Sequence, residues 1–151
     1  MSAIATFHIV PADFRTRLNA VHTSADFERI LGSSETESFD YGASGYLLAT
    51  LLPVLAAEYD LDLMDGDPDL ASKVMELSGG TAFAFTQQER ESFLDRLQPA
   101  LFEPGTLEGA YLAFNETDDD GLAPALLDGI AFLRSGLEKL RENTLALLTI
   151  D

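Results

Sequence analysis

The 151-residue chain contains no cysteine and no tryptophan. Without cysteine there are no disulfides, thiolate metal sites or cysteine nucleophiles, and a reducing compartment is favoured. Without tryptophan, a sugar site would lack its preferred aromatic platform. Only two histidines are present, so a Ser–His–Asp relay would have to use His8 or His22. The composition therefore excludes cysteine-based chemistry and leaves two candidate catalytic histidines.

Long apolar segments are also missing. The first ten residues have neither a basic region nor an apolar run typical of a secretory signal. The longest apolar stretch, residues 46–57, is interrupted by Thr50 and Pro53 and is too short to span a bilayer. From these features we expect a soluble cytoplasmic protein that does not bind membranes.

Positive charge is scarce, with nine Lys and Arg against 26 Asp and Glu, for a formal net charge of −17. Two windows, residues 35–69 and 101–121, contain no Lys or Arg and carry 15 of the acidic residues. Such clustering produces a strong negative field that repels nucleic acid and anionic membranes and attracts basic partners. The charge pattern therefore predicts a basic protein partner and no direct nucleic-acid binding.

The length predicts one domain over residues 1–151, and a hydrophobic content of 46% with ten Phe predicts a substantial core. Alternating residues predict a strand over 3–10, and apolar runs predict further strands over 81–85 and 145–150. Helical patterns fill most of the rest of the chain. We therefore expect a helix-rich α+β fold in which these three strands form one small sheet.

Capping residues predict where several helices begin and end. The segment Thr86-Gln87-Gln88-Glu89 is a capping box, and Asp67-Pro68 should open a helix that stops at Gly79-Gly80. Other boundaries are predicted as follows: Pro11 in the first turn of a helix, Ser24 as a cap with Gly32 as the stop, residues 33–44 as a loop, Gly45 to Tyr59 as a buried helix kinked or interrupted at Pro53, Thr106 as a cap, and 122–142 as a long helix that follows Asp118 to Asp120.

The chain resembles the YfbM-like family of small uncharacterised bacterial proteins. The resemblance lies in the opening Met1 to Phe7, in Val10 to Phe14, and in the later order of Gly79-Gly80, a strand, a helix capped by Thr86, a long helix and a final strand. It covers most of the chain as architecture, although the family's Asp-Lys-x-Trp segment has no counterpart. It implies no specific chemistry or cofactor. Some small bacterial proteins of this kind are suspected immunity partners of toxins.

Motifs that would identify an enzyme are absent, since no Gly-x-Ser-x-Gly, His-Glu-x-x-His or phosphate-binding loop occurs. Within the first strand, His8 is expected to be a hydrogen-bonded core residue. Near a helix end, His22 is expected to be a cap or a surface residue. Paired carboxylates could support glycoside hydrolysis, but fifteen clustered acids bring some pair together by chance.

One metal motif can be considered. The residues Asp65, Asp67, Asp69 and Glu76 occupy positions 1, 3, 5 and 12 of a loop resembling an EF-hand. The glycine required at position 6 is replaced by Leu70, and residues after Asp67 have a helical pattern that would separate the ligands. We keep these four carboxylates as weak calcium candidates and predict no cofactor.

The leading functional hypothesis is a non-enzymatic binding protein that neutralises a basic partner, in the manner of an immunity protein or antitoxin, or that mimics nucleic-acid charge. Acids would steer the partner, and Phe39, Tyr41 and Tyr59 would anchor it. The alternative for each of these aromatic side chains is a place in the core. A small carboxylate-based hydrolase or metal-dependent protein, and a housekeeping domain without a specific ligand, are alternatives. The oligomeric state stays open. The predicted contact residues are Glu37, Phe39, Asp40, Tyr41, Tyr59, Asp60, Asp62, Asp65, Asp67, Asp118, Asp119 and Asp120.

Overall fold

A computed structural model of the chain describes residues 3–33, 35–115 and 121–151. Within these residues, four strands form one antiparallel sheet in the spatial order β2–β1–β4–β3. The three predicted strands are confirmed and a fourth joins them at one edge. The strands are β1 (Ala5–Pro11), β2 (Glu37–Asp40), β3 (Thr81–Phe85) and β4 (Thr144–Ile150).

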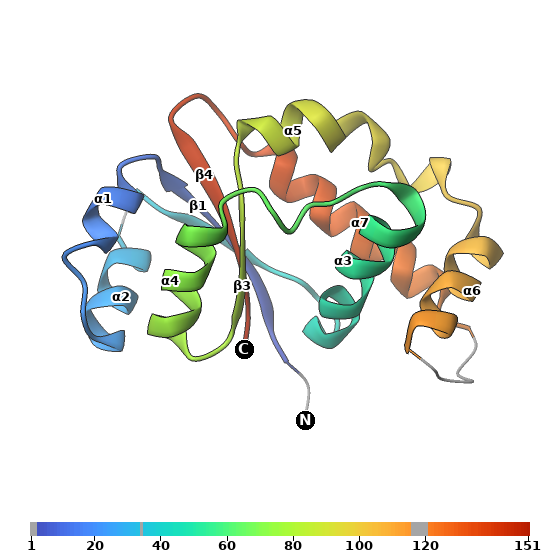
Figure 1. The fold of residues 1–151 in the computed structure, drawn as a ribbon, viewed down its shortest axis with the longest axis horizontal. Coiled ribbons are helices and arrows are strands. Elements are labelled where there is room, and N and C mark those ends of the chain that lie inside the picture. The colour runs from blue at the N-terminus through green and yellow to red at the C-terminus, as the bar shows by residue number, and fades with distance from the viewer. Residues whose placement is uncertain (1–2, 34, 116–120) are drawn as a thin grey trace.

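The C-terminal strand β4 lies in the middle of the sheet, between β1 and β3 (Figure 1). Six of its seven residues are buried, on both faces of the sheet. Its pairing with β1 continues past the strand, where Ile4 and Asp151 exchange backbone hydrogen bonds of 2.9 and 3.0 Å. Both ends of the described chain therefore lie together at one end of the sheet.

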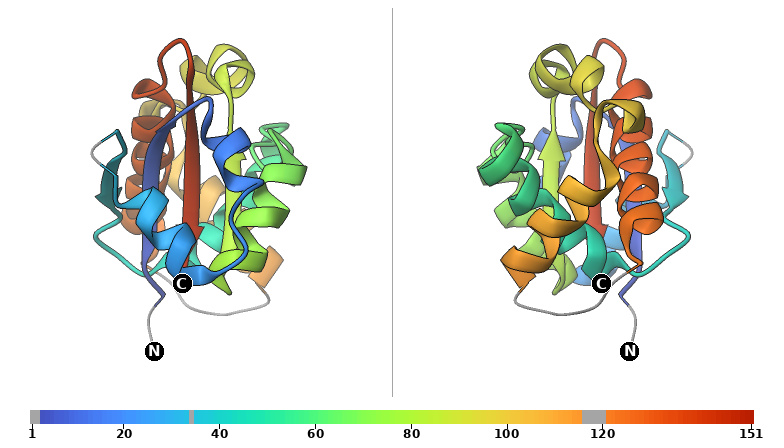
Figure 2. Two further views of the ribbon diagram at one scale, coloured as in Figure 1. Left: turned by 90° about the vertical axis from the view of Figure 1, so that its left-hand side faces the viewer. Right: turned by 90° about the vertical axis from the view of Figure 1, so that its right-hand side faces the viewer.

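Helices cover both faces of the sheet and produce three layers (Figures 1 and 2). One face carries α1 (Phe14–Leu18), α2 (Ser24–Leu31) and α4 (Pro68–Ser78); the other carries α3 (Gly45–Tyr59), α5 (Gln87–Phe93), α6 (Pro104–Asn115) and α7 (Ala123–Glu138).

Two short 3₁₀ turns, η1 (Leu94–Arg96) and η2 (Pro99–Leu101), connect α5 to α6. No helix in the described part of the chain is long and apolar enough to cross a membrane.

Two apolar clusters hold these layers together, one on each face of the sheet. On the α3–α7 side, the buried ring of Phe7 contacts the rings of Phe39, Phe85 and Phe132, with centroids 4.9–5.7 Å apart. On the other side, α1, α2 and α4 pack on the alternate residues of β1, β3 and β4. Alternation along the strands thus feeds two cores, which explains why β4 is apolar almost throughout.

Most predicted helix ends are confirmed, because capping depends on local hydrogen bonds. The Thr86 capping box is present, and the side chain of Asp67 accepts a hydrogen bond from the N–H of Leu70. Gly32 and Gly79 end α2 and α4.

Four boundaries differ from the predictions. Pro11 ends β1, Thr23 caps α2 in place of Ser24, the side chain of Glu103 holds the first turn of α6 in place of Thr106, and α7 ends at Glu138. Helix α3 runs through Pro53 as one helix.

The prediction of a loop over residues 33–44 is wrong at its centre. Residues Glu37–Asp40 form β2, which pairs with β1 over Thr6 to Ile9. Only Phe39 of this strand is apolar, so the sequence shows no alternation strong enough to indicate a strand. Its backbone hydrogen bonds come from an edge of the sheet that only the folded chain provides.

Close packing at Gly136 provides a test of this core. A Cβ atom at Gly136 in α7 would lie 2.6 Å from ring atoms Cε1 and Cε2 of Phe7, whose ring is held by its aromatic neighbours. We expect Gly136→Ala to lower the free energy of unfolding by about 2 kcal/mol or more, measured by urea denaturation.

A matched control is Gly109→Ala in α6, where no atom lies within 4 Å of the new Cβ. This change should raise stability by about 0.5–1 kcal/mol, because alanine favours the helix. Equal effects of the two substitutions would contradict the packing described for α7 against β1.

Candidate functional site

The loop that follows α3 carries exposed aspartates and packs into the core through two leucines. Leu61 and Leu63 are 2% and 1% exposed, whereas Asp60 and Asp62 between them are exposed. The N–H of Leu61 donates to the carbonyl of Leu55 at 3.1 Å. The alternation of Asp and Leu over residues 60–63 therefore directs the aspartates to the surface and the leucines into the core.

Hydrogen bonds within the chain hold this loop in place. Asp60 ends α3 with a φ of 54°, and Asp62 Oδ1 accepts from the N–H of Met64 at 3.0 Å. Gly66 lies so close to the Ala84 carbonyl and the Glu89 carboxylate that any side chain there would collide with them. The acids are presented by a well-anchored loop rather than by a free segment.

Two of these carboxyl groups lie against each other. The protonated Asp65 carboxyl donates a hydrogen bond to Asp62, and this bond together with the negative charge of Asp62 raises the pKa of Asp65 above its ordinary value. Among the described residues, no Lys or Arg forms a salt bridge with either carboxylate. The pair holds repulsion that a positive charge from outside would relieve.

The second acidic window meets this loop at Tyr59. The rings of Tyr59 and Phe102 lie 5.0 Å apart at their centroids. Burial raises the pKa of Tyr59, and the charges of Glu103 and Glu58 raise it further. We call the exposed acids beside this contact and in the loop after α3 the acidic surface: Glu58, Asp60, Asp62, Asp65 and Glu103.

An apolar and a basic residue accompany the acidic surface. Leu101 of η2, next to Phe102, is 65% exposed. Arg96 Nη2 donates to the carbonyl of Tyr59 at 2.8 Å, so one positive charge lies nearby. Leu101 was missed in the sequence, because no periodic pattern distinguishes an exposed leucine in a short turn. Tyr59 itself is half-buried, and its hydroxyl is enclosed without a hydrogen-bond partner in the described structure.

The predicted contact residues of β2 lie elsewhere and have partners within the chain. Glu37 pairs with Lys139 at 2.7 Å, a hydrogen bond that lowers the pKa of Glu37. Phe39 stacks on the core ring of Phe7 and lies under Lys139 Nζ, 4.9 Å from its ring centroid. Asp40 accepts a 2.8 Å hydrogen bond from Thr6. Phe39 thus packs into the fold, and its exposed surroundings are not purely acidic.

The anchor role predicted for Tyr41 does not fit its position. The side chain is only 8% exposed, and its ring lies 4.9 Å from that of Phe132. Its hydroxyl donates to the Ala125 carbonyl at 3.3 Å. The aromatic stack on β1 and α7 draws Tyr41 inward, and nothing in its local sequence distinguishes this from exposure. The last three predicted contacts, Asp118, Asp119 and Asp120, lie outside the described residues.

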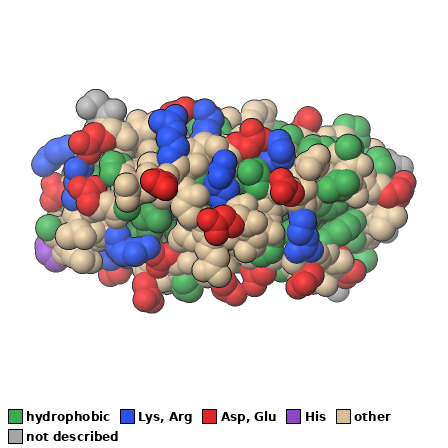
Figure 3. Space-filling view, turned by 90° about the horizontal axis from the view of Figure 1, so that it is seen from above, with side chains coloured by type: hydrophobic (Ala, Val, Ile, Leu, Met, Phe, Trp, Pro, Cys, Tyr) green, Lys and Arg blue, Asp and Glu red, His purple; other side chains and the backbone are tan. Residues whose placement is uncertain are grey.

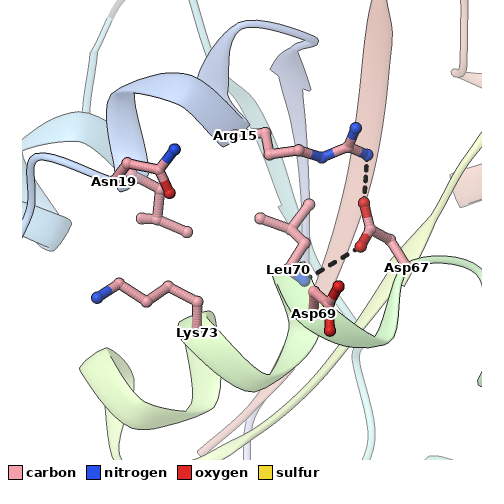
Figure 4. Close-up of a pocket in the computed structure, with 7 residues that line it drawn as sticks. Arg15, Asn19, Asp67, Asp69, Leu70 and Lys73 are labelled. Carbon is pink, nitrogen blue, oxygen red and sulfur yellow. Dashed lines mark hydrogen bonds and ion pairs between the residues drawn. The ribbon is translucent and has the colours of Figure 1, made fainter.

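Asp67 lines a pocket of about 320 Å³ between α1 and α4 (Figure 4). Its carboxylate pairs with Arg15 and caps α4 through the N–H of Leu70 at 3.1 Å. Asp69 and Lys73 also line the pocket, with the ammonium group of Lys73 directed away from Asp67. The four formal charges cancel, so this pocket is not an extension of the acidic surface.

The calcium candidates are not brought together. Asp65 contacts Asp62, Asp67 contacts Arg15, and Glu76 is exposed farther along α4. Across the described residues, no group of three or more His, Asp or Glu side chains is arranged to hold a metal ion. The reason is that α4 begins at Pro68 and carries Asp69 and Glu76 along its own axis, away from the preceding loop.

Several basic side chains of the protein are ion-paired. The face seen from above in Figure 3 mixes Lys and Arg side chains with Asp and Glu. Arg17, for example, pairs with Glu35 at 2.9 Å and with Asp13 at 3.2 Å. Glu35, although it belongs to the first acidic window, is therefore partly neutralised.

His8 takes part in a polar cluster on the α2–α4 side of the sheet. Its Nδ1 lies 2.8 Å from Ser38 Oγ and its Nε2 lies 3.2 Å from Thr149 Oγ1. This agrees with the expected hydrogen-bonded histidine, although the side chain is half-buried rather than enclosed. His22 is exposed, in agreement with the second of its two predicted roles, a helix cap or a surface residue. The hydroxyl partners on β2 and β4 were not predicted, since they meet His8 only through strand pairing.

Comparison with known proteins supports the fold and no more. No protein-family model matches the chain, and the comparison with curated proteins finds no match. Among solved structures, the chain is similar to YfbM from Escherichia coli, a protein of unknown function. The TM-score is 0.51 at 18% sequence identity, covering 98% of this chain and 99% of that chain. The architectural resemblance noted in the sequence is thus confirmed as a shared fold.

The environment of His8 leads to a pH prediction. Burial lowers the pKa of His8 from 6.5, and the charges of Asp151 and Asp40 oppose this without reversing it. Between the lowered value and 6.5, the unfolded chain binds more protons than the folded one. The free energy of unfolding should therefore fall as the pH drops from 6.5 through this interval.

The imidazole titration can be followed directly by NMR. We expect the His8 midpoint in the folded protein to lie below 6.5, and His8→Gln to remove this part of the pH dependence of stability. A His8 midpoint at or above 6.5 would show that the carboxylates outweigh burial.

Proposed function

We propose that the protein is a non-enzymatic binding protein whose acidic surface docks a basic protein partner. Inhibition of that partner, in the manner of an immunity protein or antitoxin, is the role that this chemistry fits. Because basic partners include nucleases, mimicry of nucleic-acid charge is a closely related form of the same proposal. The acidic field acts over long range and would raise the rate of association.

The observation that carries the proposal is the close pair of Asp62 and Asp65. Their contact raises the pKa of Asp65, and the pair has no basic partner among the described residues. Buried Leu61 and Leu63 hold the loop so that the carboxylates remain near each other. Fixed, uncompensated charges are suited to a cationic ligand, because little reorganisation is needed when it arrives.

Leu101 completes the surface with an apolar contact. It is 65% exposed, beside the junction of Tyr59 and Phe102 where the two acidic windows meet. Interfaces gain most of their affinity from a few apolar or aromatic anchors, with charges mainly setting the association rate. The carboxylates would therefore raise the rate of association, and Leu101 would slow dissociation of the complex.

A kinetic experiment separates these two contributions. The partner would first be recovered on the immobilised protein from the cells that make it, and then purified. Changing Asp60, Asp62 and Asp65 together to Asn should slow association about tenfold at low salt and weaken its salt dependence. Asn is tolerated in the left-handed conformation of Asp60, and its oxygen at 62 can still accept from Met64.

The matched control makes the same change in net charge on the other side of the sheet. Asp26→Asn, Asp69→Asn and Glu76→Gln lie on α2 and α4. This triple variant should leave the association rate within about twofold of the original, whereas Leu101→Ser should mainly speed dissociation. Equal slowing by both triple variants would reduce the effect to net charge and refute a defined docking surface.

A further inference from the structure

A second cavity lies between the sheet and α2, apart from the acidic surface. It has a volume of about 200 Å³, below the roughly 300–1,000 Å³ usual for drug-sized ligands. Thr6 and His8 from β1 and Thr149 from β4 line it on the sheet side, and Phe27 and Leu31 of α2 line it on the other. The space suits a small molecule with one polar end.

Strands β1 and β4 are polar at this cavity and apolar farther along the same face. Val10, Leu145 and Leu147 are buried under the helices, whereas Thr6, His8 and Thr149 bear polar groups. Thr149 is only 5% exposed, which is a position normally occupied by an apolar residue in this strand. Hydrogen bonds of His8 with Ser38 and Thr149 fix the imidazole at the cavity wall.

The charged groups of the cavity all have the same sign. Glu28 and Asp151 line it, and no Lys or Arg is among the described lining residues. The charge of Asp40 reaches His8 from β2, and that of Asp151 reaches it from the end of β4. Burial favours the neutral imidazole, so His8 can accept or donate a hydrogen bond without adding positive charge.

Gly80 helps to place one of these carboxylates. A Cβ atom at Gly80 would lie 2.7 Å from the Ile150 carbonyl and would also collide with the side chain of Asp151. The absence of a side chain at the end of α4 therefore leaves room for the Asp151 carboxylate beside the cavity.

We propose that this cavity binds a small primary ammonium compound with a short apolar stem. The ammonium group carries three N–H donors and no acceptor. The carboxylates of Glu28 and Asp151 and the oxygens of Thr6 and Thr149 supply acceptors, and Phe27 and Leu31 contact the stem. An anion is disfavoured by two carboxylates without a base, and a larger ligand by the volume.

The two histidines allow a direct test by NMR, with the full-length protein and n-butylamine as the probe. At constant ionic strength and pH 7.5, the His8 imidazole signals should shift and saturate, while those of exposed His22 stay in place. Butan-1-ol, which has the same stem without the charge, should cause no saturable shift at the same concentrations. Signals that move linearly, or both histidines moving alike, would overturn the proposal.

Matched variants decide whether the carboxylate matters. Glu28→Gln should weaken n-butylamine binding about tenfold, because hydrogen bonds to a charged group are roughly twice as strong as neutral ones. Glu91→Gln, on exposed α5 across the sheet, makes the same charge change and should leave the affinity unchanged. Equal weakening by both variants, or equal binding of butan-1-ol and n-butylamine, would refute an ammonium site in this cavity.

Discussion

The burial of β4 on both faces is the constraint on which the rest of the structure depends. A strand that pairs on both edges and is apolar on both faces must be covered by helices on two sides. The helices α1, α2 and α4 supply one cover and α3, α5, α6 and α7 the other. Three layers follow from a single apolar strand at the end of the described chain.

This arrangement separates the two surfaces for which we propose functions. The acidic surface forms where α3 ends and the segment before α6 packs on it, through Tyr59 and Phe102. The polar cavity forms on the opposite side of the sheet, where Thr149 replaces the apolar residues of β4. The charges of the described residues include ion pairs, a neutral pocket at Arg15 and Asp67, and a loop in which Asp62 and Asp65 form no salt bridge.

The shared fold with YfbM adds an architecture and no chemistry, since the identity is 18% and the function of that protein is unknown. Functional argument must therefore come from particular side chains. In the acidic loop, alternation places Leu61 and Leu63 inward and the aspartates outward. The same alternation in β1 turns Thr6 and His8 toward the cavity while Phe7 enters the aromatic core.

Local patterns in the sequence determined the three long strands, the caps at Asp67 and Thr86, the stops at Gly32 and Gly79, and the acidic windows. These features depend on neighbours within a few residues, so they can be read along the chain. The sequence also predicted that His8 is hydrogen-bonded, but it did not identify either hydrogen-bond partner.

Only the tertiary structure decided the pairing of β2, the burial of Tyr41, the withdrawal of Asp67 into an ion pair with Arg15, and the meeting of the two acidic windows. Each of these joins residues far apart in the chain. The same is true of the calcium candidates, which are close in sequence but are separated by the axis of α4. Charge and periodicity are properties of the sequence, whereas a charge's partner and exposure are set by packing between distant segments.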